Sequence, residues 1–308
     1  MSKVIRIGTR ESQLALWQAE CVRQLLTEND LPATIVGIKS EGDMDLQTPL
    51  YELGVQGVFT RNLDAALLAG KIDLAVHSLK DVPTVPAKGI RQAAVLPRGP
   101  VKDLLVWRTD TGFMNDSAGK ATIATGSVRR KAQWLHRFPH HRIADLRGNV
   151  NTRLRKLGES DWQGAIFAAA GLERIGIRPE HSLELDWMLP APAQGAIVVV
   201  CREDDPESHA AAARFNDAVT ELCTTLERDF LRALLGGCST PISAYACVKD
   251  KQLLFEGNIV SPDGKRKLEI RKEAPVADAE NLGIAAASAL LDQGAGAIIS
   301  TLKSPPAS

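Results

Sequence analysis

The chain has 308 residues, 44% of them hydrophobic and 24% charged, which excludes a disordered chain and favours two or three compact domains. Its 37 basic residues balance its 37 acidic ones, so no overall field draws it to DNA or to an anionic membrane, and anion recognition must come from local clustering. Aromatic residues make up only 5%, too few for the stacking surfaces that bind single-stranded nucleic acid.

The first third of the chain alternates strand-like and helical patterns. Strands are predicted over residues 4–8, 34–39 and 72–76, and helices from residue 12 onward and over residues 62–69. Ser12 or Thr9 is available to cap the first helix. Residues 72–76 are apolar on both faces, as in a buried parallel strand, and lead into the polar turn HSLKDVP.

A second stretch repeats strand, polar loop and helix three times. The predicted strands cover residues 122–125, 142–146 and 164–169, and the helices after the first two run to residues 137 and 157. In open α/β sheets, ligands bind beyond the carboxyl ends of the strands, which is where these loops lie. The sequence itself shows no convincing repeat.

The last third predicts a return to the first domain followed by a separate unit. Residues 193–201 form a predicted strand after a Pro-rich linker, and we expect it to cross back to the first sheet. A small α+β domain is then predicted from a helix (217–235), three strands (243–248, 253–260 and 267–272) and a final helix (278–292). The expected domains are residues 1–96 with 196–213, residues 101–191, and residues 218–308.

Basic side chains cluster over residues 129–156, where nine arginines and lysines accompany one acid. Arg129, Arg130 and Arg147 lie at strand-to-helix turns, where helix amides favour anions, and each guanidinium binds two carboxylate or phosphate oxygens at once. Three further basic turn residues join this set: Arg10, Lys80 and Arg174. A shared cleft would bind a polycarboxylate or a polyphosphate, although no GxxxxGK[ST] loop is present for nucleotide hydrolysis. The alternative is a solvated basic face.

One acid, Asp81, falls among these cations. A carboxylate near several positive charges is normally ionised, so Asp81 would stabilise a cationic intermediate or accept an N–H hydrogen bond. The alternative is an Asp that caps the turn before a Val-Pro pair. His77 in the same turn fits a structural histidine with satisfied hydrogen bonds better than a ligand. The six histidines show no HExxH or similar spacing, so no metal site is predicted.

The five cysteines form no CxxC pair and no even-numbered framework, which fits a reducing compartment. Four of them lie where a small buried hydrophobic residue is expected: Cys21, Cys201, Cys223 and Cys247. Cys238 differs because it follows two glycines at a predicted helix end, which leaves its thiol room to act as a nucleophile or attachment point. A buried structural cysteine is the alternative there.

No apolar run approaches the roughly 20 residues that span a bilayer. The first 18 residues carry charges throughout and lack a signal-peptide core. We therefore expect a soluble, cytoplasmic protein.

Seven segments carry a more specific signal: IGTRESQLALWQ (7–18), AVHSLKDVP (75–83), ATGSVRRKAQ (124–133), DLRGNVNTRL (145–154), AAAGLERIG (168–176), PAQGAI (192–197) and LGGCSTPI (235–242). In this order, over nearly the whole chain, they resemble the porphobilinogen deaminase (hydroxymethylbilane synthase) family. The resemblance implies an α/β fold of two periplasmic-binding-protein-like lobes plus a small α+β C-terminal domain that carries the cofactor on a cysteine loop.

The resemblance also implies a reaction and a set of residues. The reaction joins four porphobilinogen molecules head to tail, releases four ammonias and yields hydroxymethylbilane after hydrolysis. Cys238 would hold a dipyrromethane cofactor through a thioether, and Asp81 would be the catalytic carboxylate that stabilises each azafulvenium cation. Cofactor contacts are implied for Lys80, Asp81, Ser127, Arg129, Arg130, Arg147 and Gly171. Contacts to the carboxylates of porphobilinogen and of the growing linear oligopyrrole are implied for Arg10, Ser12, Arg147, Arg153, Arg174 and Gln194.

We expect a monomer with no metal, no membrane and no nucleic-acid partner. The competing interpretation is a non-catalytic two-lobed anion-binding or regulatory protein that uses the same arginines. It accounts for a cationic cleft but not for Asp81 or the LGGC motif. Nucleic-acid binding through residues 129–156 conflicts with the zero net charge and the low aromatic content.

Overall fold

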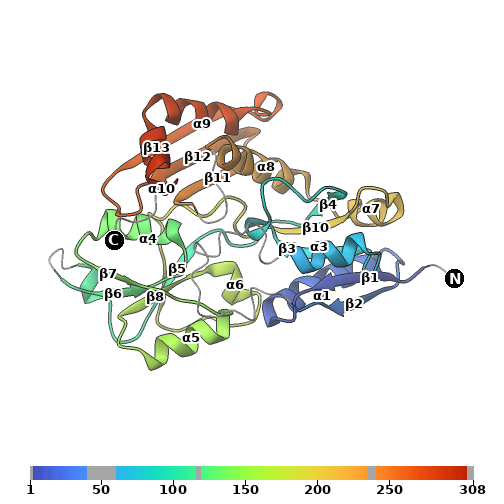
Figure 1. Cartoon of the computed structure of the whole chain (residues 1–308), viewed down its shortest axis with the longest axis horizontal. Coiled ribbons are helices and arrows are strands. Elements are labelled where there is room, and N and C mark those ends of the chain that lie inside the picture. Colours follow the sequence, from blue (N-terminus) through green and yellow to red (C-terminus); the bar gives the residue numbers. More distant parts are fainter. Residues whose placement is uncertain (1–2, 40–59, 116–118, 235–239, 304–308) are drawn as a thin grey trace.

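The computed structural model of the chain describes residues 3–39, 60–115, 119–234 and 240–303. Over these residues the strands form two five-stranded sheets and one three-stranded sheet. Figure 1 shows each sheet with its own helices: the first lobe in blue with a golden return strand, the second lobe in green, and the C-terminal unit in orange and red. Two α/β lobes and a small α+β unit confirm the predicted fold class.

The sheet of the first lobe has the strand order β2-β1-β3-β10-β4. Its strands are β1 (Ile5–Thr9), β2 (Ala33–Gly37), β3 (Leu74–Ser78), β4 (Ile90–Val95) and β10 (Ile197–Arg202), and its helices are α1 (Gln13–Glu28), α3 (Arg61–Leu68) and α7 (Pro206–Ala213). The first three strands are parallel, whereas β10 pairs antiparallel with β3 and β4. The predicted return to the first sheet is therefore confirmed, with the strand starting at Ile197.

The second lobe repeats this topology with the strand order β7-β6-β8-β5-β9. Its strands are β5 (Asp103–Trp107), β6 (Thr122–Ala124), β7 (Arg142–Ala144), β8 (Gly164–Ala168) and β9 (Ser182–Glu184), and its helical segments are the 3-10 turn η2 (Gly112–Met114), α4 (Val128–Arg137), α5 (Val150–Glu159) and α6 (Ala169–Glu173). The parallel trio β7-β6-β8 corresponds to β2-β1-β3, and antiparallel β5 corresponds to β10. The repeat is thus one of topology, not of sequence.

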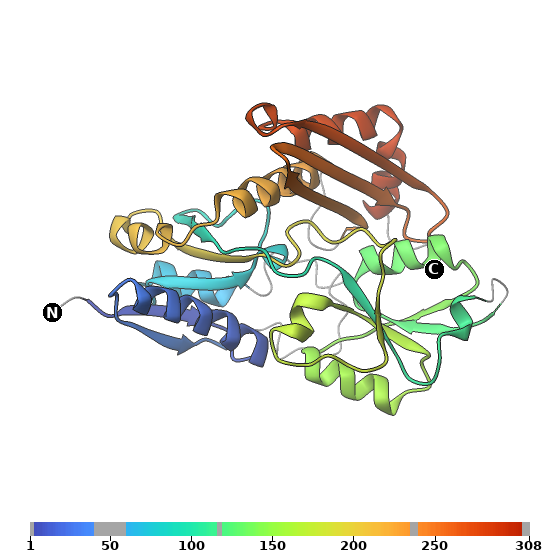
Figure 2. The ribbon, with the colours of Figure 1, turned by 180° about the vertical axis from the view of Figure 1, so that it is seen from behind.

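Two segments join the lobes, one between β4 and β5 and one between β9 and β10 (Figure 2). They touch through a hydrogen bond from the backbone N–H of Gly99 to the carbonyl of Gly195, 3.0 Å long. A Cβ at Gly195 would lie 2.6 Å from the Gly99 carbonyl oxygen, and φ there is +86°, so this close approach requires glycine. The crossings place the two lobes face to face.

The C-terminal unit is an antiparallel sheet packed against helices. Its elements are β11 (Ile242–Lys249), β12 (Gln252–Val260), β13 (Lys267–Pro275), α8 (Ala218–Ala233), the 3-10 turn η3 (Val276–Asp278), α9 (Leu282–Asp292) and α10 (Ala295–Lys303). Phe230 of α8 packs edge-to-face on Phe255 of β12, with ring centroids 5.3 Å apart. The three predicted strands are confirmed. The final predicted helix begins at Leu282 instead of residue 278, because η3 precedes it.

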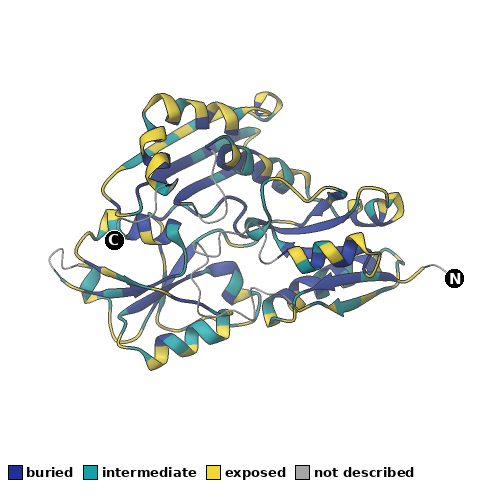
Figure 3. Cartoon of the chain, in the orientation of Figure 1, coloured by how far each residue is buried: buried dark blue, intermediate teal, exposed yellow. Residues whose placement is uncertain are grey.

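The inner strands of both lobes are buried on the two faces of their sheets, which explains their apolar runs (Figure 3). Along β3, Leu74 and Val76 belong to one apolar cluster and Ala75 to the cluster on the opposite face. Within the described residues, no single helix is long and apolar enough to cross a membrane, and the bent pair α9 and α10 passes that test only when the two are taken together.

The prediction of four buried cysteines is correct for two of them. Cys201 and Cys223 are buried, whereas Cys21 and Cys247 are only partly buried. The buried stripe of α1 runs through Ala19, and Cys21 lies beside that stripe. Cys247 lies toward the end of β11, where burial decreases.

Candidate active site

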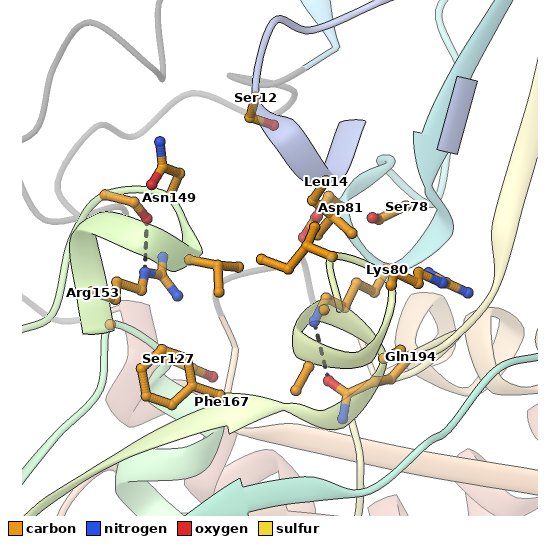
Figure 4. A pocket seen from close by; sticks show the side chains of 18 of the residues that line it. Ser12, Leu14, Ser78, Lys80, Asp81, Ser127, Asn149, Arg153, Phe167 and Gln194 are labelled. Atoms are coloured by element: carbon orange, nitrogen blue, oxygen red, sulfur yellow. Dashed lines mark hydrogen bonds between the residues drawn. The ribbon is translucent and has the colours of Figure 1, made fainter. Parts of the chain in front are cut away.

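A cavity of about 700 Å³ lies between the two lobes. The residues that follow β1, β3, β6, β7 and β8 line it, so the cavity lies at the carboxyl ends of the parallel strands, as the sequence predicts. In Figure 4, Ser12, Ser78 and Asp81 of the first lobe lie on one side, and Asn149 and Arg153 of the second lobe on the other.

All predicted site residues in the described part of the chain line this one cavity. They are Arg10, Ser12, Lys80, Asp81, Ser127, Arg129, Arg130, Arg147, Arg153, Gly171, Arg174 and Gln194. Cys238, the predicted attachment point, lies outside the described residues. The structure thus brings the cations of both lobes together.

Three helix N-termini face the cavity, and each is capped by a side chain that lines it. The Ser12 hydroxyl caps α1, the Ser127 hydroxyl caps α4 and the Asn149 carboxamide caps α5, each accepting from the backbone N–H three residues further on. Gly126 precedes Ser127 because a Cβ there would lie 2.6 Å from the carbonyl oxygen of Leu146. Helix N-termini favour anions, so the backbone adds to the positive field of the arginines.

The predicted Lys80 and Asp81 lie on a 3-10 turn, η1 (Leu79–Asp81), directly after β3. Lys80 Nζ donates to Gln194 Oε1 at 3.2 Å, a contact that links the first lobe to the second crossing segment (Figure 4). Burial, together with the charges of Arg130 and Arg129, lowers the pKa of Lys80 to about 8, although Asp81 and Asp103 oppose the shift. The ammonium is therefore held where its charge is costly.

The C-terminal unit holds this turn in place. Arg228 of α8 donates to three carbonyl oxygens around η1, at 3.3 Å from Leu79, 2.9 Å from Val82 and 2.6 Å from Pro83. Three bonds from one guanidinium fix the backbone beside Asp81, so the position of the carboxylate depends on the third unit as well as on its own lobe.

Arg129 and Arg130 are organised by an acid that the sequence analysis missed. Asp103 at the start of β5 is fully buried, and it accepts from Arg129 Nη2 at 2.7 Å and from Arg130 Nη2 at 2.8 Å. Burial by itself would raise the pKa of that carboxyl. The two arginines outweigh this effect and hold the pKa well below its usual range. Arg129 and Arg130 are 4% and 5% exposed, so a solvated basic face is wrong for them.

Arg153 shows how tightly the cations are crowded. Its Nε donates to the Gly148 carbonyl at 2.7 Å. Burial, together with the charges of Arg130, Arg147 and Arg10, lowers the pKa of Arg153 to about 10, whereas Asp81 opposes the shift. Such crowding is relieved by an anionic ligand.

His77 departs from its prediction. It is buried, but its Nε2 has no hydrogen-bond partner among the described residues, so it is not a satisfied structural histidine. It lines a smaller cavity of about 260 Å³ on the α3 side of the sheet. Burial and the charge of Arg10 lower its pKa to about 4, which keeps the ring neutral. Within the described residues, no group of three or more His, Cys, Asp or Glu side chains gathers to hold a metal.

The fold and the cavity define a two-lobed protein with a cationic site between its lobes, in which the carboxylate of Asp81 also lies. Residues 5–210 match the family model "Porphobilinogen deaminase, dipyromethane cofactor binding domain", and residues 221–292 match the C-terminal domain model of the same family. The chain therefore belongs to the porphobilinogen deaminase family.

Curated relatives extend over the full length. The porphobilinogen deaminase of Syntrophotalea carbinolica is 42% identical over 99% of this chain and 98% of its own length. That of Acidithiobacillus ferrooxidans is 41% identical over 98% of this chain and 99% of its own length. The porphobilinogen deaminase of Thiobacillus denitrificans is 39% identical over 97% of this chain and 98% of its own length.

Among solved structures, a periplasmic substrate-binding protein of an ABC transporter from Coxiella burnetii covers 68% of this chain and 91% of its own, with 17% identity and a TM-score of 0.42. An amino-acid substrate-binding protein from Streptococcus pneumoniae covers 70% of this chain and 87% of its own, with 14% identity and a TM-score of 0.39. The two lobes of this chain are defined by its own strand topology.

Proposed function

We propose that the chain joins four porphobilinogen molecules head to tail with loss of ammonia, on a covalently bound dipyrromethane primer, and releases hydroxymethylbilane. The observation that carries this proposal is the crowding of buried cations in the cavity between the lobes, with the carboxylate of Asp81 among them. Porphobilinogen carries an acetate and a propionate group, so every added unit brings two further carboxylates. A surplus of positive charge that burial makes costly is the environment such a ligand requires.

We assign the substrate's carboxylates to the cations and hydrogen-bonding groups that line the cavity. They are Arg10, Ser12, Arg147, Arg153, Arg174 and Gln194. Arg153 has the clearest physical case, because a carboxylate beside it would offset the repulsion that lowers its pKa to about 10. Ser12 already accepts a bond from the α1 backbone, so it would donate its hydroxyl proton to the ligand while it caps the helix.

We assign the chemistry to Asp81. Each addition breaks the C–N bond of the substrate's protonated aminomethyl group, and ammonia leaves with the bonding electrons; the pyrrole carbon at the end of the chain then bonds to the methylene carbon and loses its proton. Between these two steps the substrate is a cation, and a carboxylate fixed beside it lowers the barrier by stabilising charge as it develops. Arg228 anchors the Asp81 turn, so that carboxylate is preorganised.

The cavity also fits the dipyrromethane cofactor that its family model names. Arg129 Nε is buried and has no partner within the described residues, although the residue lines the cavity, so a donor at the wall is available for a cofactor carboxylate. We assign the cofactor to Lys80, Asp81, Ser127, Arg129, Arg130, Arg147 and Gly171, with covalent attachment through Cys238. When bound, this group supplies the pyrrole carbon on which the first substrate is added.

The finer features of the assignment are proposals too. The domains are residues 1–96 with 196–213, 101–191, and 218–308. The protein acts as a monomer in the cytoplasm on porphobilinogen and its oligomers, without a metal, a membrane or a nucleic acid as partner. The zero formal net charge supports the absence of nucleic acid, because a phosphate backbone is held mainly by excess basic charge.

The test combines catalysis with mass. Purified protein incubated with porphobilinogen should consume it and release ammonia. Its denatured mass should exceed the sequence mass by two linked pyrrole units that survive thiol reduction, because a thioether does not exchange with thiols. Peptide mapping should place the excess on Cys238, and Cys238→Ser should lose it. Binding of porphobilinogen without ammonia release, by protein of bare sequence mass, would instead identify an anion-binding protein.

A further inference from the structure

Asp103 organises the arginine side of the cavity although it is not among the predicted site residues. Its two oxygens accept four side-chain hydrogen bonds: from Arg129 Nη2 (2.7 Å), Arg130 Nε (3.1 Å), Arg130 Nη2 (2.8 Å) and Gln194 Nε2 (2.9 Å). The carboxylate is fully buried. It balances one of the two adjacent positive charges and fixes both guanidinium planes.

Gln194 extends this arrangement to the opposite lobe. Its amide nitrogen donates to Asp103 and to the Val101 carbonyl at 2.8 Å, and its amide oxygen accepts from Lys80 at 3.2 Å. An amide has one donor end and one acceptor end. Because a carboxylate can only accept, Asp103 forces the nitrogen toward itself and the oxygen toward Lys80.

We propose that Asp103 is a positioning residue for the reaction: it holds Arg129 and Arg130 in register at the cavity wall and, through Gln194, sets the position of Lys80 next to Asp81. This inference rests on the proposed function for its kinetic consequence. Its structural consequence, the coupling of Lys80 to Asp103 across the lobes, can be measured without catalysis.

Asp103→Asn is the sharpest perturbation. It retains the volume of the side chain, but it leaves Arg129 and Arg130 buried side by side without a counter-charge. The new amide also presents N–H groups to partners that are donors themselves. The orientation of the Gln194 amide, with its oxygen toward Lys80, is then no longer fixed.

Asp73 provides a matched control. It is likewise fully buried, and it accepts two bonds from the Arg6 side chain, from Nε and Nη2, both at 2.9 Å. It lies at the start of β3, far from the strand ends that form the cavity, and it does not line that cavity. Asp73→Asn therefore removes a buried carboxylate that is paired with an arginine outside the cavity, although the Arg6 side chain itself is 37% exposed.

The first measurement is the pH dependence of Lys80 reactivity, by competitive acetylation and peptide mass spectrometry. The charged groups that act on Lys80 are Asp81 on its own turn, Arg129 and Arg130 on α4, and Asp103 on β5. Asp103 favours the ammonium form, so in Asp103→Asn the titration of Lys80 should move to lower pH. Asp73→Asn should leave it at the wild-type position.

The second measurement is steady-state kinetics with porphobilinogen, together with the denatured mass of each variant. Asp103→Asn should raise KM about tenfold or more, the loss expected for one misplaced charge-assisted bond, or should lack the covalent pyrrole units that Asp73→Asn retains. Wild-type kinetics, mass and Lys80 titration in folded Asp103→Asn would overturn the inference.

A second variant keeps the test decisive if Asp103→Asn does not fold. Gln194→Met cuts the link to Lys80 and leaves the Asp103 ion pairs in place. It should also shift the Lys80 titration, and an unshifted titration would refute the coupling. Wild-type protein that does not consume porphobilinogen would refute the proposed function instead, while the Lys80 titration would still decide the coupling.

Discussion

Glu227→Gln should destabilise the protein strongly, because Glu227 joins the C-terminal unit to both crossing segments. The side chain is fully buried on α8. Its Oε1 accepts from Arg98 Nη1 (2.6 Å) and from the Ala246 backbone N–H (2.7 Å), and its Oε2 accepts from Arg98 Nη2 (2.9 Å) and from the Ala193 backbone N–H (2.6 Å). Each oxygen thus faces one cationic and one backbone donor.

The magnitude follows from that symmetry. In the glutamine variant, the NH2 group replaces one of the two oxygens and then faces two groups that can only donate. Rotating the side chain moves the NH2 group to the other oxygen's place, where it again faces two donors. Arg98 also loses its counter-charge while it is only 12% exposed. Breaking a buried ion pair by removing one partner costs about 3–5 kcal/mol. For a chain of this size, that predicts a fall in Tm of roughly 6–20 °C, at about 2–4 °C per kcal/mol.

The assay is urea unfolding at 25 °C followed by circular dichroism, with a calorimetric scan for Tm. Glu221→Gln on the same helix is the control, because Glu221 accepts from the amides of Gln92 and Asn216, and turning the Gln92 amide alone gives every donor an acceptor again. The free energy of unfolding of this control should stay within about 0.5 kcal/mol of the wild-type value. A Glu227→Gln protein that unfolds at the same urea concentration as this control would refute the reasoning.

Two further predictions address the site, and a third concerns the buried ring of His77. Asp81→Asn should fold normally but lose at least about a hundredfold in turnover, since a preorganised charge of this kind contributes roughly 3–4 kcal/mol; wild-type kcat in the folded variant would exclude Asp81 from the chemistry. Arg147→Leu should impair cofactor assembly or elongation, because a lost bond to a carboxylate costs about 1.5–3 kcal/mol; a large fall in Tm with normal kinetics would assign Arg147 to the fold. His77 has a pKa of about 4 when folded against about 6.5 when unfolded, so the unfolded chain binds more protons between these values and stability falls as pH drops from 6.5 to 4, by up to about 3 kcal/mol. His77→Gln should unfold with a shallower pH dependence over this window, and an unchanged slope would contradict the buried neutral ring.

Much of the fold could be predicted because its signals are local. Buried parallel strands such as β3 have apolar runs, and each ends in a polar turn, so the cavity at their carboxyl ends followed from the pattern. The strand β5 was not predicted, because it opens with Asp103, and an acid usually marks a loop. That acid is buried only because arginines 26 and 27 residues further on pair with it. Such distant compensation leaves no trace in a local pattern.

Helix caps explain another part of the difference. Ser12 was predicted as a possible cap of the first helix and as a ligand contact, and Ser127 only as a cofactor contact; the structure uses both hydroxyls as N-caps at the cavity edge. Asn149, which caps α5 in the same way, was not among the candidates. Its signal was present, since Asn is a favoured N-cap and it follows Arg147 and Gly148 at a strand-to-helix turn.

The crowding of cations links stability to ligand binding. Burial and mutual repulsion lower the pKa of Lys80 to about 8 and that of Arg153 to about 10, so the folded protein holds charges whose burial opposes folding. The apolar cores of the three units have to offset that cost. A ligand that brings carboxylates between the lobes would relieve it, and by mass action whatever binds only the folded state stabilises that state. The same arginines that select a polycarboxylate should therefore make the ligand-free protein the less stable form.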